Sequence, residues 1–169
     1  MISAIKSKAV TMCPGCGLVL PNEQGPVHRY LGSSPACWRL FGEVLSREYS
    51  DPQYRVVHRL TVDAYAAQHP GKESPQTIQT VALHLISLCL VLEDGYPLDK
   101  ATRAIGQAAR RKKEFWWLTP PASLGAITVR EVHAANTPEE HGSVVRRWAE
   151  TVWVAWAAHH DTVRRWTSR

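Results

Sequence analysis

The stretch that decides the fold of this 169-residue chain begins Cys13-Pro14-Gly15-Cys16-Gly17, passes through His28 and ends Ser34-Pro35-Ala36-Cys37-Trp38. Proline fixes one backbone φ angle inside the Cys-x-x-Cys sequence. The glycines permit the positive φ angles that let both sulfurs face one centre. Such a pattern is typical of a zinc knuckle, in which thiolates hold a tetrahedral ion. The stretch 13–37 therefore predicts a metal-binding arm.

Side chains in this arm have the spacing of a zinc site. Cys13 and Cys16 supply two thiolates, and a redox pair or free thiols are the alternatives for them. Cys37 falls in the first turn of a predicted helix, where the helix N-terminus favours a metal-binding thiolate, although a small buried core residue is its alternative. The pattern Cys-x2-Cys-x11-His-x8-Cys makes His28 the favoured fourth ligand, with His58 and His69 as competitors and a surface or capping role as its alternative. The predicted cofactor is Zn²⁺, held by Cys13, Cys16, Cys37 and His28.

Four helix starts are marked by a capping residue followed by proline. The capping side chain accepts a hydrogen bond from the first turn, and proline suits the first helical position because it lacks an N–H group. The four pairs are Ser34-Pro35, Asp51-Pro52, Ser74-Pro75 and Thr137-Pro138. They predict helices over 35–49, 52–69, 75–93 and 138–166, and an alanine-rich segment predicts another over 98–113.

The expected architecture is a mainly α protein, a bundle of about five helices with an N-terminal zinc knuckle. We expect a single domain over 1–169, in which the arm 13–37 joins a helical bundle over 35–169. Short loops between the first four helices favour antiparallel neighbours. The segment 127–132 predicts a short strand that could pair with a β-hairpin in the arm.

The cellular compartment follows from what the chain lacks. The N-terminus has no apolar run of the kind that a signal peptide needs. The most apolar run, 81–92, covers 12 residues, against the roughly 20 that span a bilayer. We therefore expect a cytoplasmic protein without membrane contact, in which the cysteines are metal thiolates rather than half-cystines.

The predicted helix 52–69 carries a second group of chemically active side chains. His58 and His69 lie 11 residues apart, about 16 Å along a helix, so they cannot share one ion. An antiparallel pairing of helices 52–69 and 75–93 would bring His84 level with residues 61–65. A pocket there would suit a metal- or His/Asp-dependent enzyme; its candidate catalytic residues are His58, Asp63, Tyr65, His69 and His84. The structural alternative is a buried hydrogen-bond network, or Asp63 paired with Arg59 one helical turn away.

Basic and aromatic residues at 110–117 indicate a third function class. Arg110-Arg111-Lys112-Lys113 followed by Phe115-Trp116-Trp117 superficially resembles a nucleic-acid surface. The same charges suit a helix C-terminus, and the net charge of +5 permits an acidic partner without requiring one. Nucleic-acid binding is therefore kept as an alternative and not favoured.

Several motifs point to one family. They are the arm motifs 13–17, 25–30 and 34–38, followed by 57–65 and Gln68-His69-Pro70-Gly71. Together they resemble an uncharacterised bacterial protein family known only as a domain of unknown function. The resemblance covers nearly the whole chain and implies a small bacterial cytoplasmic protein, but no activity. The favoured function is a zinc-binding helical protein with a structural metal, acting as a binding or interaction module for an unknown protein or small-molecule partner.

Overall fold

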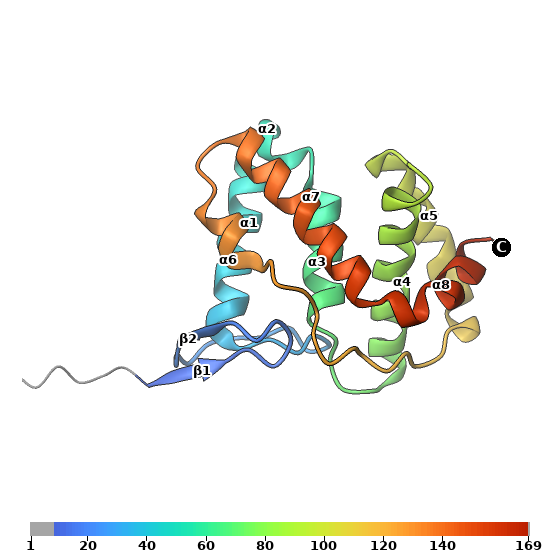
Figure 1. The fold of residues 1–169 in the computed structure, drawn as a ribbon, viewed down its shortest axis with the longest axis horizontal. Coiled ribbons are helices and arrows are strands. Elements are labelled where there is room, and N and C mark those ends of the chain that lie inside the picture. Colours follow the sequence, from blue (N-terminus) through green and yellow to red (C-terminus); the bar gives the residue numbers. More distant parts are fainter. Residues whose placement is uncertain (1–8, 169) are drawn as a thin grey trace, which may run out of the picture.

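The computed structural model describes residues 9–168, which form a mainly helical fold with one short β-hairpin (Figure 1). Strands β1 (Val10–Met12) and β2 (Val19–Pro21) pair antiparallel, with Thr11 opposite Leu20. The hairpin lies below the helices in Figure 1, at the end where α1 begins. The predicted mainly α class with an N-terminal hairpin is confirmed.

Eight α-helices follow in the described residues, more than the predicted five. Two predicted helices are each interrupted, the one over 52–69 near Val57 and the one over 138–166 at Trp156. The helices are α1 (Pro35–Ser50), α2 (Pro52–Arg55), α3 (His58–Gln68), α4 (Pro75–Leu92), α5 (Leu98–Ala108), α6 (Val129–Ala134), α7 (Pro138–Ala155) and α8 (His160–Thr167), with 3₁₀ turns over Ala109–Glu114 and Ala157–His159.

The four predicted helix caps are confirmed. Each capping side chain accepts a hydrogen bond from a backbone N–H of the first turn, and each helix has proline at its start. The donors are Cys37 for Ser34, Gln53 for Asp51, Thr77 for Ser74 and Glu140 for Thr137. These helix starts follow from local chemistry, which is why the sequence predicts them well.

The predicted strand over 127–132 is wrong, because this segment contains the start of α6. Thr128 accepts a hydrogen bond from the Arg130 N–H, and the Glu131 carboxylate accepts one from the Thr128 N–H. This capping box stabilises the first turn of a helix. The segment therefore begins a helix and not a strand.

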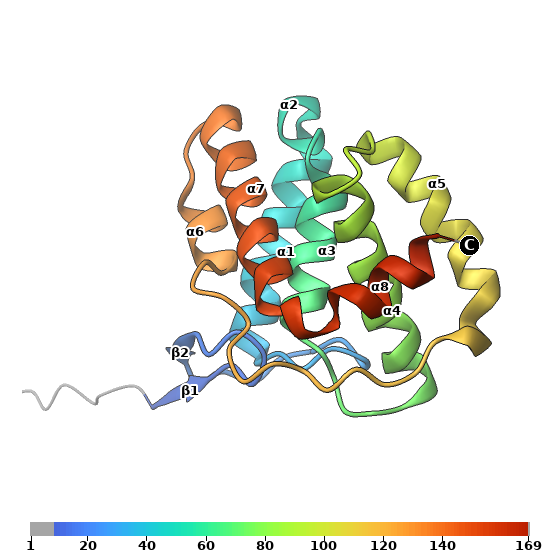
Figure 2. The same ribbon diagram turned by 45° about the vertical axis from the view of Figure 1, so that its right-hand side comes forward.

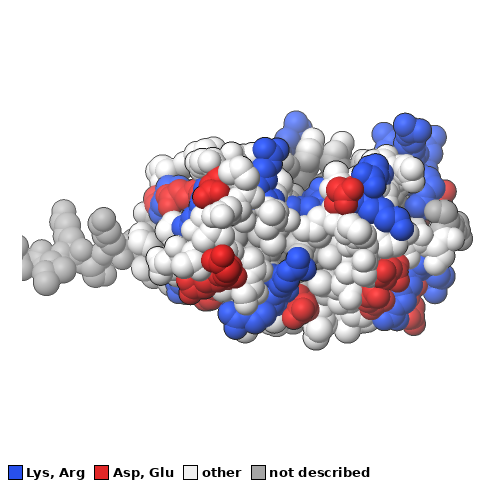
Figure 3. Space-filling model, turned by 90° about the horizontal axis from the view of Figure 1, so that it is seen from above, with Lys and Arg blue, Asp and Glu red and all other residues white. Residues whose placement is uncertain are grey.

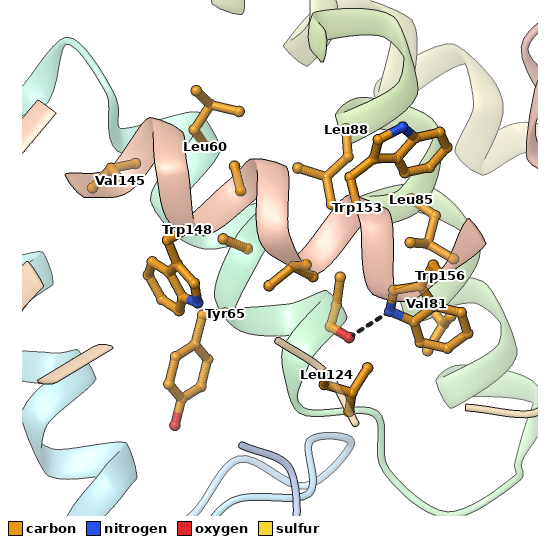
Figure 4. Close-up of a cluster of buried hydrophobic side chains, with 14 of the residues drawn as sticks. Leu60, Tyr65, Val81, Leu85, Leu88, Leu124, Val145, Trp148, Trp153 and Trp156 are labelled. Carbon is orange, nitrogen blue, oxygen red and sulfur yellow. Dashed lines mark hydrogen bonds between the residues drawn. The ribbon is translucent and has the colours of Figure 1, made fainter. Parts of the chain in front are cut away.

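The core lies where α3 packs between α4 and α7 (Figures 1 and 2). Figure 4 shows Trp153 and Trp156 beside the leucines and the valine labelled on α4, and Trp148 beside Tyr65 of α3. The Trp156 Nε1–H donates to the Ala67 carbonyl at 3.0 Å, and the Trp148 Nε1–H donates to Gln68 at 2.9 Å. Burying such large rings contributes about 2–3 kcal/mol each. The C-terminal end of α3 is thereby held firmly, and this end carries part of the site described below.

Helix α4 is apolar enough to cross a membrane by length and composition alone. Its mean hydropathy is 1.5 over 18 residues, and half of that window is buried inside the fold. The window is longer than the 12-residue run of the sequence analysis because it includes residues 75–80. Helices α3, α5 and α8 pack against α4, so contacts within the fold cover part of its apolar surface.

Glu93, which caps the C-terminus of α4, ties α8 to α4. Arg164 donates to its carboxylate from Nε at 2.9 Å and from Nη2 at 2.8 Å, and Trp153 donates from Nε1 at 3.2 Å. Led by those from Arg164, these hydrogen bonds outweigh desolvation and lower the pKa of Glu93 to about 2. The carboxylate is therefore ionised over the whole physiological range.

A Glu93→Gln variant is expected to be less stable than the wild type at neutral pH, and this difference is expected to shrink in acid. The folded pKa lies below the ordinary value of 4.5, so the contribution is present above pH 4.5 and is lost as the pH falls towards 2. We expect a thermal midpoint about 2–4 °C lower at pH 7, as a modest loss of stability produces in a chain of this size. Melting both proteins at pH 7 and pH 3 tests this; an equal difference at both would contradict it.

Candidate metal centre

Cys13, Cys16, Cys37 and His69 come together where the hairpin arm meets the ends of α1 and α3. Their ligand atoms all lie within 4.8 Å of one another. The Cys16 and Cys37 sulfurs are 3.8 Å apart, and the Cys37 Sγ lies 3.4 Å from the His69 Nε2. A tetrahedral zinc site has sulfur–sulfur separations of about 3.8 Å and sulfur–nitrogen separations of about 3.6 Å. These two separations match a tetrahedral site, and the four ligand atoms lie close enough together to hold one ion.

The knuckle is shaped by its two glycines. Gly17 has φ of +74° and its N–H donates to the Cys13 carbonyl at 2.9 Å, which closes the turn. Gly15 packs directly on His69: a Cβ atom at position 15 would lie 2.5 Å from the His69 Cδ2. Only glycine lets the turn approach the imidazole this closely.

Cys37 lies in the first turn of α1, as the sequence predicts. Its N–H donates to the Ser34 side chain at 3.3 Å. The Tyr65 hydroxyl donates to the Cys37 sulfur at 3.5 Å. A donor of this kind orients a metal thiolate and stabilises its charge.

His69 caps the C-terminus of α3 and is held there from two sides. Gly32 donates from its N–H to the His69 carbonyl at 2.9 Å, next to a β-bridge between Leu31 and Pro70. The His69 Nδ1 lies 2.7 Å from the Tyr65 carbonyl. A carbonyl only accepts, so Nδ1 carries the proton and Nε2 is left with its lone pair towards the cysteines. This is the tautomer that binds a metal ion.

The structure places His69, and not His28, beside the three cysteines. His28 is exposed, and its Nδ1 accepts a hydrogen bond from the Tyr30 N–H at 3.1 Å. Its ring packs at 5.5 Å from the Trp38 ring. The spacing favoured His28 because a short hairpin between Cys16 and Cys37 would bring this histidine close to the cysteines. The bridge to Pro70 brings the end of α3 there instead.

The charges of the three thiols depend on one another. Hydrogen bonds from Cys16 and Cys37 lower the pKa of Cys13, and the same contact raises the pKa of Cys16 to about 11. The pKa of Cys37 is raised by its Cys13 and Cys16 neighbours and by burial. The cluster therefore loses the proton of one thiol readily, and the loss of all three thiol protons requires a nearby cation. A bound divalent ion supplies that charge.

The five candidate catalytic residues divide among three places. Tyr65 and His69 stand at the metal centre. His58 pairs with Glu48, with 2.7 Å between His58 Nδ1 and Glu48 Oε2. Asp63 and His84 form the third place.

Asp63 is fully buried and accepts hydrogen bonds from three side chains. Arg59 donates from Nη2 at 2.6 Å, His84 from Nδ1 at 2.8 Å, and the Ser87 hydroxyl also donates. The pairing of Asp63 with Arg59 is the structural alternative to a catalytic role that the sequence predicted. Helices α3 and α4 pack side by side, as the predicted pairing of Asp63 with His84 needs.

A second buried network surrounds Glu48 of α1, which the sequence analysis did not single out. Glu48, Thr61 and His141 are all inaccessible to solvent. Burial alone raises the pKa of Glu48, but hydrogen bonds from His141, His58 and Thr61 together lower it below its usual value. The signal for this network in the sequence was a glutamate on the otherwise apolar face of a predicted helix.

The comparisons with known proteins identify the family. The model of a family of unknown function (DUF5946) matches residues 11–157, most of the chain. The chain belongs to this family. The searches with this chain found no matching curated protein and no matching solved structure.

Proposed function

We propose that this member of a family of unknown function is a zinc-binding helical protein with a structural metal, acting as a binding or interaction module. The observation that carries the proposal is the cluster of three thiols and one imidazole, of which Cys13, Cys37 and His69 are buried. Four protein ligands fill a tetrahedral zinc ion, whereas catalytic zinc sites keep one position open for water or substrate.

The structural role is supported by what the centre joins. Its ligands come from the knuckle, from the first turn of α1 and from the end of α3, three segments distant in the sequence. An ion bound to all three closes long loops, which stabilises the folded state against the unfolded chain. Zinc–thiolate ligation fits the proposed reducing cytoplasm.

The rival function classes have less support. An enzyme built on the five candidate residues needs most of them in one pocket. In the described residues Tyr65 and His84 line a common cavity, whereas His58 pairs with Glu48 and His69 lies among the cysteines. For nucleic acid, a continuous basic face would be expected. Acidic and basic side chains are intermingled on the face shown in Figure 3, and Arg111 of the basic run is bonded to Glu114 and to the Trp166 carbonyl.

Zinc content measured on matched histidine variants tests the ligand set. The purified wild-type chain is expected to hold one zinc ion, and His69→Gln is expected to lower the affinity by at least tenfold because one of four ligands is lost. His28→Gln is the control and is expected to keep full affinity. Elemental analysis and competition with a chelator give both values. A wild type free of zinc, or equal behaviour of the two variants, would contradict the proposal.

A further inference from the structure

We infer that a cavity between α1, α3 and α4 binds a small, uncharged aromatic molecule that carries a hydroxyl group. The inference deepens the proposed binding role, on which it rests, by naming a site and a ligand class. The cavity has a volume of about 280 Å³ and is also lined by His28 and Leu31 of the loop before α1. Ligand pockets usually measure roughly 300–1,000 Å³, so this one suits a molecule of one or two rings.

Aromatic side chains form one wall of the cavity. The Tyr65 ring is stacked on Phe41, with 3.7 Å between ring centroids and 10° between planes, and Trp38 lies 5.9 Å away. The His69 ring stacks on Tyr65 at 3.9 Å, so the proposed metal centre holds this wall in place. Phe41 and His69 cover the two faces of the Tyr65 ring, so this wall offers ring edges and the partly exposed Trp38 ring, which a flat aromatic ligand can meet edge to face.

His84 provides a hydrogen-bond acceptor at the cavity. Its Nδ1 lies 2.8 Å from the Asp63 carboxylate. A carboxylate only accepts, so Nδ1 carries the proton, and the tautomer with its one proton on this nitrogen has its lone pair at Nε2. This Nε2 has no protein partner within residues 9–168 and is not enclosed. A ligand hydroxyl can donate to it.

His28 also lines the cavity. Its Nδ1 accepts from the Tyr30 N–H, so in the neutral ring the proton is on Nε2. A ligand hydroxyl that donates its hydrogen to His84 can also accept a hydrogen bond at its oxygen, and His28 is a candidate donor.

The charge of the ligand follows from the partners of Asp63. Arg59 and Ser87 bind its carboxylate together with His84, so the buried negative charge is already paired. No unpaired charge among these residues is left to attract an ion. The cavity therefore favours a neutral ligand.

Binding of 2-naphthol to the zinc-loaded full chain tests the inference. We expect saturable binding with a Kd on the order of 100 µM, typical of a well-placed ligand of this size. The ether 2-methoxynaphthalene, which cannot donate, is expected to bind at least tenfold more weakly. NMR titration of the protein at matched free ligand concentrations measures both.

Three variants locate the site. Val62→Trp, at a lining position of α3, is expected to fill the cavity and abolish binding, and His84→Leu is expected to weaken it at least tenfold. His133→Leu is the matched control, because His133 also pairs with a carboxylate, that of Glu43 at 2.6 Å, on the surface. It is expected to bind as the wild type does.

The outcomes separate this inference from the zinc proposal, because zinc content and helicity are measured on every sample. A folded, zinc-loaded wild type that does not bind 2-naphthol overturns the inference and leaves the metal centre standing. Binding that survives Val62→Trp, or equal binding of the ether, also overturns it. Specific binding by a protein free of zinc supports this cavity and contradicts the metal proposal.

Discussion

A Cys13→Ser/Cys16→Ser variant is expected to lose its zinc and at least about 5 kcal/mol of its free energy of unfolding. Structural zinc binding contributes roughly 10–16 kcal/mol in zinc-finger peptides, and this free energy is folding free energy where the site exists only in the folded chain. Part of the stability is retained here, because the tryptophan-rich core between α3, α4 and α7 is built mostly from residues outside the knuckle. We therefore expect a helical but destabilised protein with a detached arm.

Guanidinium titrations followed by circular dichroism measure this loss, and proteolysis of the arm reports its detachment. Cys89→Ala is the matched control. Cys89 is equally buried, in α4, and burial raises its pKa to about 12, so it stays a protonated core residue. Its variant is expected to keep zinc and to lose only about 1–2 kcal/mol. Unchanged stability of the double variant would exclude a structural metal.

A Glu48→Ala variant is expected to destabilise the fold by about 3–5 kcal/mol, the usual cost of removing one partner from a buried ionic network. The substitution leaves Thr61, His58 and His141 without their acceptor. His141 suffers most, because it is fully buried and its Nδ1 already has no partner within residues 9–168. Each buried donor left unpaired costs about 1–3 kcal/mol.

The control for this prediction lies on the same helix. Glu43 also pairs with a histidine, His133, and with Arg39, but its side chain is 47% exposed. Glu43→Ala is expected to cost about 1 kcal/mol or less, because exposed ion pairs are solvated and screened. Urea denaturation of both variants measures the two losses. Similar losses would show that burial of the Glu48 network is not what stabilises α1 against α3 and α7.

The sequence anticipated the features that depend on neighbours in the chain. The four proline-started helices form as predicted, because cap and proline act within one turn. Cys37 also lies where its predicted helix start places it. The predicted strand at 127–132 is wrong, although the capping box of Thr128 and Glu131 that begins α6 is just as local.

Long-range contacts decided the rest. Spacing alone favoured His28 next to the cysteines, whereas the Leu31–Pro70 bridge and the cap position of His69 bring the end of α3 to the knuckle. The partners of Glu48 were equally hidden, since His141 comes from α7, 93 residues along the chain.

By itself, the sequence determined the mainly α class, the helix starts and the three cysteines that meet at one centre, because caps, prolines and a Cys-x-x-Cys turn act over a few residues. Only the tertiary structure decided which histidine joins those cysteines and which carboxylates are buried with histidine partners. Those choices depend on how α1, α3, α4 and α7 pack, and side chains far apart in the sequence become neighbours only when the helices bury their apolar faces against one another.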